Sequence, residues 1–263
     1  MSIDRIPFHA SVLIMALAMP VLSQGAQPSA PPTVAAASDL RFAMEEIAAQ
    51  FEAETKRRVR LALGSSGNFY TQIEQGAPFE LFMSADEQFV FKLAASGRAE
   101  DRGALYATGR IVLFAPHASA LKIDAQMADL GPALSDGRVR RFAIANPQHA
   151  PYGRAAEQAL KSLGLWEAIR PRLVLGENAS QAAQFATSGS AQGGIFAYSL
   201  ALAPSVSKAG NYVLLPEGLH RPLLQRMVLL KGAGETARIF YSYLQQPAAR
   251  AVFKRYGFVL PTD

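Results

Sequence analysis

The chain has 263 residues, of which 50% are hydrophobic and 18% are charged, and it contains no cysteine. This composition excludes a disordered chain and a fibre, and the lack of cysteine excludes disulfides, thiolate metal sites and a cysteine nucleophile. The formal net charge of +5 leaves open nucleic acid, a membrane surface or small anions as partners.

Residues 1–26 have the pattern of a secretory signal. Arg5 precedes an apolar run over 10–22, and small residues at Gly25 and Ala26 indicate the cleavage region. The run is short for a membrane span, so an uncleaved anchor is the less favoured alternative. Residues 27–32 then form a short, proline-rich tether. We therefore expect an exported, periplasmic protein, for which nucleic acid is not an expected partner.

Short β-rich segments alternate with helical periodicity along the rest of the chain. Apolar residues recur at helical spacing over 40–51, 155–163 and 237–244. This alternation predicts an α/β fold with mostly parallel sheets, either as one doubly wound sheet or as two lobes. The predicted strands are 33–37, 59–63, 81–83, 110–114, 141–145, 172–175, 194–197, 212–215 and 226–230.

Four strand-to-helix junctions are rich in hydroxyl residues, asparagine and glycine. They follow the strands 33–37, 59–63, 141–145 and 172–175. In open α/β sheets, ligands bind beyond the carboxyl ends of the strands, where free N–H groups at helix starts can hold an oxyanion. Serine, aspartate and asparagine are also the ordinary N-cap residues, so one such junction indicates only capping. Four together favour an anion site.

Several longer motifs, well separated along the chain, carry a specific resemblance. They are AAASD (35–39), GSSG (64–67), QIEQGAP (72–78), LFMSAD (81–86), NPQHAPYG (146–153), GEN (176–178) and FKRYGF (253–258). With these motifs in this order, the chain resembles the periplasmic molybdate-binding proteins of ABC importers over about 33–258.

The resemblance implies a two-lobed α/β periplasmic binding protein fold, type II-like, with the ligand cleft between lobes joined by crossing strands. The first lobe would take 33–111 and the returning segment 223–263, and the second lobe would take 112–222. The crossings would lie near 111–114 and 223–227. Ligand binding would close the lobes by a hinge, and the closed form would dock on a membrane permease.

The resemblance also carries five ligand-binding residues onto this chain. Ser38 and Ser66 would each donate a hydroxyl and a backbone N–H to the oxyanion. Asp39, Tyr152 and Ala179 would each donate a backbone N–H. Molybdate or tungstate would be held through its oxygens, without direct side-chain coordination of the metal and without a cofactor.

One motif departs from the family pattern. Some relatives use a tyrosine hydroxyl at the end of an Ile-Val-Tyr motif, whereas Ala197 ends the comparable segment here. Tyr198 is out of register by one residue, so no tyrosine phenol is assigned to the site.

The carboxylate of Asp39 would repel a doubly charged anion unless it points away from it. The favoured interpretation is a helix cap, and the alternative is an acceptor for a protonated anion such as hydrogen phosphate. His149, in the loop before Tyr152, is expected to be exposed to solvent rather than to face the cleft.

The predicted function is that of a monomeric extracytoplasmic solute-binding protein that captures molybdate, and also tungstate, for an ABC importer. It is not expected to be an enzyme, because the serines lack a Gly-x-Ser-x-Gly turn and the histidines lack metal-site spacing. The alternatives are a binding protein for sulfate, phosphate or an organic acid, an exported hydrolase, and the effector domain of a transcription regulator.

Overall fold

The protein is described by a computed structural model that covers residues 1–2 and 30–261. Of the predicted signal (1–26), only residues 1–2 are among the described residues. Of the predicted tether (27–32), only residues 30–32 are described. The chain divides into an N-terminal unit, Met1–Ala30, and a second unit, Pro31–Asp263, which carries all the described helices and strands. None of the described helices combines the length and apolar character that crossing a bilayer requires.

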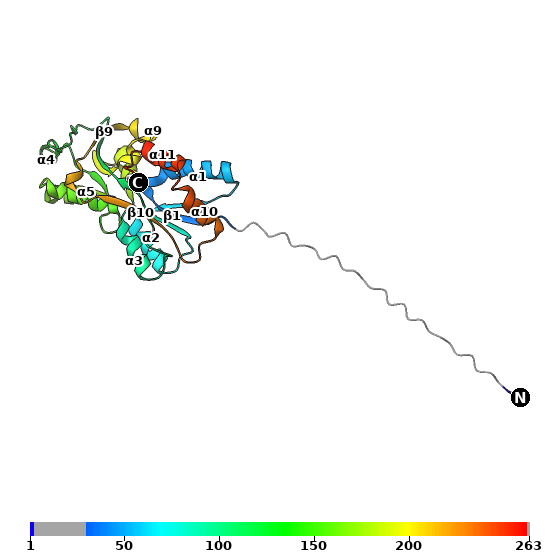
Figure 1. Ribbon diagram of the computed structural model, residues 1–263. Helices are drawn as coiled ribbons and strands as arrows, with labels where there is room; N and C mark the ends of the chain where they lie inside the picture. The colour runs from blue at the N-terminus through cyan, green and yellow to red at the C-terminus, as the bar shows by residue number, and fades with distance from the viewer. Residues whose placement is uncertain (3–29, 262–263) are drawn as a thin grey trace. The chain divides into compact units, whose positions relative to one another are not determined.

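Two five-stranded sheets form the framework of the second unit (Figure 1). The first sheet, in the order β2-β1-β3-β10-β4, contains β1 (Thr33–Ala37), β2 (Arg60–Gly64), β3 (Leu81–Ser84), β4 (Ala104–Gly109) and β10 (Leu223–Leu229). The second sheet, in the order β7-β6-β8-β5-β9, contains β5 (Ile111–Pro116), β6 (Phe142–Ala145), β7 (Leu173–Gly176), β8 (Gly193–Ala197) and β9 (Gly210–Leu214).

Both sheets have the same mixed topology. β1 is parallel to β2 and β3, and β6 is parallel to β7 and β8. β10 and β5 run antiparallel to both of their neighbours. The expectation of mostly parallel sheets is therefore wrong, since half of the pairings among the described strands are antiparallel. The reason is that one strand in each sheet enters it from the other sheet instead of through a helical crossover.

The chain passes between the sheets twice, which defines two lobes. β4 ends at Gly109 and β5 begins at Ile111, so only Arg110 separates them. The return runs from the end of β9 at Leu214 to the start of β10 at Leu223. The two-lobed fold is confirmed; the predicted lobe limits, 33–111 with 223–263 and 112–222, remain a proposal. β4 is a strand that the sequence pattern did not predict.

Helices cover both sheets. In the segments of the first sheet these are the 3₁₀ helix η1 (Ser38–Leu40), α1 (Arg41–Thr55), α2 (Ser66–Glu74), α3 (Glu87–Ala95), α10 (Glu235–Tyr243) and α11 (Pro247–Arg255). In the segments of the second sheet they are α4 (Leu130–Ser135), α5 (Pro151–Ser162), α6 (Trp166–Ile169), η2 (Arg170–Arg172), α7 (Ala179–Thr187), α8 (Tyr198–Ala201), α9 (Pro204–Ser207) and η3 (Glu217–Leu219).

The C-terminal helices pack against α1 and so rejoin the first lobe (Figure 1). The helical periodicity over 40–51 places Ile47 and Phe51 on the buried face of α1. The ring of Phe51 meets Phe240 of α10 edge-on, with 4.8 Å between centroids, and meets Tyr243 at 5.3 Å. Burying such side chains stabilises the fold by about 1.5–3 kcal/mol each, which fixes α10 against α1.

Candidate functional site

Four helix starts follow the carboxyl ends of parallel strands, as the sequence predicted. η1 follows β1, α2 follows β2, α5 follows β6 and α7 follows β7. Because β1 pairs in parallel with β2, and β6 with β7, the two starts of each lobe lie side by side. Helix starts carry unpaired N–H groups and partial positive charge. Each lobe therefore presents two groups of hydrogen-bond donors.

A narrow cavity of about 10 Å³ lies where these starts meet. All five residues of the predicted site line it, with Ser38, Asp39 and Ser66 from the first lobe and Tyr152 and Ala179 from the second. This volume is far below the range typical of pockets for drug-sized ligands. The structure thus brings the predicted residues together, while their contact with an anion remains a prediction.

The first lobe contributes two buried hydroxyl groups. Ser66 Oγ accepts a hydrogen bond from the N–H of Ala85 at 3.0 Å. Ser38 Oγ accepts one from the N–H of Ser180, on the second lobe, at 3.2 Å. Each hydroxyl acts as an acceptor in these bonds, so its proton remains available for donation.

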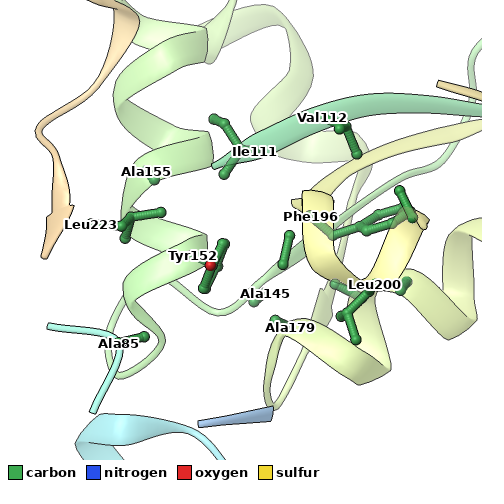
Figure 2. Close-up of a cluster of buried hydrophobic side chains, with 14 of the residues drawn as sticks. Ala85, Ile111, Val112, Ala145, Tyr152, Ala155, Ala179, Phe196, Leu200 and Leu223 are labelled. Atoms are coloured by element: carbon green, nitrogen blue, oxygen red, sulfur yellow. The ribbon is translucent and has the colours of Figure 1, made fainter. Parts of the chain in front are cut away.

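The second lobe contributes main-chain groups. Tyr152 is the second residue of α5, and Ala179 is the first residue of α7. Their N–H groups have no partner within their helices, because the first four N–H groups of an α-helix never do. The side chain of Asn178 caps α7 by accepting from the Gln181 N–H at 3.1 Å. Figure 2 shows Tyr152 in the first turn of α5, with Ala145 and Ala179 nearby.

The carboxylate of Asp39 is not a helix cap, so that expectation is wrong. Its Oδ2 accepts hydrogen bonds from the hydroxyl of Tyr152 at 2.9 Å and from Nε2 of Gln225 at 2.7 Å. Tyr106 in turn donates to Gln225 Oε1 at 2.7 Å. η1 has no side-chain cap; Asp39 is buried, and these buried donors take its Oδ2 instead. Among the described residues, Asp39 Oδ1 has no hydrogen-bond partner.

Burial raises the pKa of Asp39 from its ordinary 3.8 to about 6, although the hydrogen bonds from Gln225 and Tyr152 act to lower it. Burial and the neighbouring carboxylate raise the pKa values of Tyr152 and Tyr106 well above the usual 10.0. Both phenols therefore stay protonated at neutral pH and act as donors. In the part of the chain that the structure describes, no Lys, Arg or His forms an ion pair with Asp39.

The lobes also touch beside the cavity, where His149 is half-buried rather than exposed as expected. Its carbonyl oxygen accepts from the Ser65 hydroxyl at 2.6 Å and from the Gly67 N–H at 3.0 Å. Its ring Nδ1 lies 2.9 Å from Ser65 Oγ. A Cβ at Gly67 would lie only 2.6 Å from the carbonyl oxygen, so this approach of the lobes requires a glycine.

The segment Ala197–Tyr198 stays outside the cavity. Ala197 ends β8, and Tyr198 begins α8, where its ring packs against Tyr212 with 5.9 Å between centroids. Neither residue lines the cavity. The absence of a tyrosine phenol of this segment from the anion site remains a prediction.

Sequence reasoning missed two buried polar residues, Gln225 and Tyr106. The predicted strand 226–230 begins after Gln225, and β4, which holds Tyr106, was not predicted. A signal for Gln225 was present, because alternation along β10 places it on the same buried face as Leu223 and Met227. A glutamine on a buried strand face requires a hydrogen-bond partner.

Two α/β lobes, joined by two crossings and holding a small cavity of hydroxyl and N–H donors between them, define a two-lobed solute-binding protein. Within the described residues, no group of His, Asp and Glu side chains is placed to hold a metal ion. The family model for bacterial extracellular solute-binding proteins matches residues 32–259, and the chain belongs to this family.

Individual relatives cover both lobes. The molybdate-binding protein ModA of Rhodobacter capsulatus is 37% identical over 253 residues, which span 95% of this chain and 94% of that protein. ModA of Azotobacter vinelandii is 37% identical over 256 residues, with 96% and 99% covered. The solved structure of the Azotobacter vinelandii periplasmic molybdate-binding protein has a TM-score of 0.79 at 33% identity, covering 88% of this chain and all of that one.

Proposed function

We propose that the protein captures molybdate between its lobes and delivers it to the membrane permease of an ABC importer. The observation that carries this proposal is the convergence of Ser38, Asp39, Ser66, Tyr152 and Ala179 on one small cavity from both lobes. The names of the ModA relatives support molybdate as the ligand.

A site made of hydroxyl and backbone N–H donors is strong enough for this task. Hydrogen bonds to a charged group contribute about 1.5–3 kcal/mol each. Roughly five to seven of them match the −12.3 kcal/mol or so of nanomolar binding, before the costs of desolvation and ordering. No cationic side chain is needed at the cavity.

We expect selectivity to follow from size and from a lining that is mostly made of donors. Phosphate keeps a proton near neutral pH, and that O–H needs an acceptor, whereas the helix starts offer N–H and hydroxyl donors. Asp39 Oδ2 is engaged by Tyr152 and Gln225, which leaves Asp39 Oδ1 as the acceptor to test with phosphate. Sulfate is smaller and would fit loosely. Tungstate, unprotonated and nearly equal in size to molybdate, would bind about as well.

We further propose that the protein acts in the periplasm as a monomer, exported by the signal at 1–26, with 27–32 as a short tether ahead of the first lobe. It has no enzymatic activity and no cofactor, and its lobes have the limits 33–111 with 223–263 and 112–222. Its net charge of +5 speeds the encounter with anions, an effect that salt screens.

Titration calorimetry of ligand-free protein with molybdate, tungstate, sulfate and phosphate tests the proposal. Submicromolar binding of molybdate and tungstate, with no binding of phosphate, is the expected result. Tight phosphate binding without molybdate binding would overturn it and would make Asp39 an acceptor for the protonated anion.

The variant Ser66→Ala tests the cavity itself. Losing one hydroxyl donor to the anion weakens molybdate binding by about 1–3 kcal/mol, measured by the same titration. Ser207→Ala, at an exposed serine of α9, is the matched control and leaves the affinity unchanged. An unchanged affinity in Ser66→Ala would remove this hydroxyl from the site.

A further inference from the structure

The phenol of Tyr152 crosses from the second lobe into a polar recess of the first lobe. The recess, called here the lobe-1 socket, consists of Asp39, Gln225 and Tyr106, all of which are buried. The Tyr152 hydroxyl donates to Asp39 Oδ2 at 2.9 Å and lies 3.0 Å from Gln225 Nε2. Gln225 is held from behind by the Tyr106 hydroxyl at 2.7 Å.

The socket is built from three separate parts of the first lobe. Asp39 lies in η1, Tyr106 in β4 and Gln225 in β10. β4 and β10 are the strands next to the two crossings between the lobes. A phenol seated in the socket therefore links the second lobe to the strands that border the hinge.

Gly109, the last residue of β4, leaves the space that the phenol needs. A Cβ at this position would lie 2.2 Å from the Tyr152 hydroxyl oxygen and 2.8 Å from Gln225 Nε2. Neither atom can retreat without breaking its hydrogen bonds, so a side chain at position 109 would keep the phenol out of the socket.

Tyr152 joins the socket to the proposed anion site, because it contributes to both. Its N–H is a donor at the start of α5, and its phenol is fixed in the first lobe. We propose that Asp39, Gln225 and Tyr106 are positioning residues: by seating the Tyr152 phenol they hold the lobes closed and place its N–H on the captured anion. This inference rests on the proposed function, since it concerns the same site.

The chemistry of the socket explains why seating favours closure. A hydrogen bond from a phenol to a carboxylate is charge-assisted and stronger than one between neutral groups. Asp39 Oδ1 has no hydrogen-bond partner among the described residues. The side-chain hydrogen bonds that stabilise the buried carboxylate are therefore those to Oδ2. Closing the lobes excludes water from Asp39 Oδ2, and among the described residues of the second lobe only Tyr152 donates to it in place of that water.

The test compares Tyr152→Phe, Tyr106→Phe and Gly109→Ala with the wild type. Tyr152→Phe removes the phenol hydroxyl and keeps the N–H, whereas Gly109→Ala keeps the hydroxyl and blocks its seat. Tyr212→Phe and Gly218→Ala are the matched controls, because Tyr212 packs on Tyr198 away from the socket and a Cβ at Gly218 meets nothing within 4 Å. Stopped-flow kinetics with molybdate and melting temperatures are measured for every variant.

If the socket holds the closed state, the dissociation rate of molybdate rises about 10- to 100-fold in Tyr152→Phe, as expected for one lost hydrogen bond to a charged group. The association rate changes much less than the dissociation rate, because most effects of substitutions at one interface fall on dissociation. Gly109→Ala behaves in the same way, Tyr106→Phe shows a smaller rise, and the two controls match the wild type. Lower melting temperatures with unchanged dissociation rates would overturn the proposal and reduce the socket to a structural network.

The failure of the proposed function would be visible separately. If the wild type binds no molybdate, the proposed function fails. Small-angle scattering of the ligand-free protein then tests whether the socket holds the lobes closed. A larger radius of gyration in Tyr152→Phe and Gly109→Ala than in the wild type supports the socket, and equal radii contradict it.

Discussion

The two lobes contribute to the cavity in different ways. The first lobe presents side chains, with the hydroxyls of Ser38 and Ser66 and the buried carboxylate of Asp39. The second lobe presents the main chain, through the starts of α5 at Tyr152 and of α7 at Ala179. Alanine substitutions therefore test the hydroxyl donors of the first lobe, whereas the N–H donors of the second lobe must be tested by changes to the backbone.

The polar side chains at the starts of η1 and α7 also differ in what they bind. Asn178 keeps its side chain local and caps α7 through the Gln181 N–H. Asp39 instead sends its carboxylate away from its own turn, to Gln225 and to Tyr152 of the other lobe. The first lobe thus carries a buried charge that depends on the second lobe, and we find no equivalent among the cavity residues of the second lobe.

The largest effect is expected from Asp39→Asn, which removes this charge and keeps an acceptor oxygen. The pKa of Asp39 is raised from 3.8 to about 6 by burial, so the folded state binds the proton more tightly than the unfolded chain does. Wild-type stability therefore falls as the pH rises from 4 through 6. Relative to the wild type, the variant gains nothing at pH 4 and up to roughly 3 kcal/mol at pH 8, read from urea unfolding at each pH.

Asp129→Asn is the control, for which we expect a change in stability of the opposite sign. Hydrogen bonds from Arg138 hold the pKa of Asp129 at about 2, so its charge stabilises the fold above that pH. The variant should lose stability at neutral pH and approach the wild type only in strong acid. A gain in Asp39→Asn that does not change between pH 4 and pH 8 would show that Asp39 carries no buried charge.

The second lobe is tested by Ala179→Pro, which removes one N–H from the cavity. Proline is tolerated at the first position of a helix, and the preceding Asn178 has extended backbone angles that a following proline accepts. Molybdate affinity should fall about 10- to 100-fold, because one hydrogen bond to the anion is lost. Calorimetry measures the change.

Glu235→Pro is the matched control, at the first position of α10 and far from the cavity in sequence. It loses an ion pair with Arg57 in which Glu235 is 75% exposed, so we expect little change in stability and none in affinity. If Ala179→Pro binds molybdate like the wild type, the second lobe does not contribute this main-chain donor.

The smallest effect on molybdate affinity is expected from substituting a charged side chain at the contact between the lobes. Arg154 of α5 pairs with Asp86, which also caps α3, and both side chains are partly exposed. Arg154→Gln should weaken molybdate binding by less than about 1 kcal/mol, with the difference shrinking as salt is added. A loss of several kcal/mol would mean that this pair, rather than the buried groups, holds the lobes together.

The sequence predicted the positions of most strands and all four helix starts, because periodicity and turn composition are local. It did not predict β4, which begins with four apolar residues without alternation and ends in Thr108 and Gly109. It also did not predict that β5 and β10 each run antiparallel to their own neighbours. That orientation depends on which sheet a strand joins after the chain crosses between the lobes.

The site was predicted through resemblance, and its side-chain contacts were not. Asp39 stands at a helix start, where aspartate usually caps, but its partners Tyr152 and Gln225 are remote in the sequence. His149 lies in a loop, where histidine is usually exposed, but it contacts Ser65 of the other lobe. Pairings between lobes leave no local pattern, so only the structure shows them.

A crystal structure of the protein with molybdate, with anomalous data collected at the molybdenum edge, tests most directly whether the anion lies between the lobes. We predict one anomalous peak in the cavity between the lobes, with oxygens within hydrogen-bond distance of Ser66 Oγ and the Ala179 N–H. A peak confined to the molecular surface, or to the larger pocket lined by Arg41 and Gln184, would contradict it.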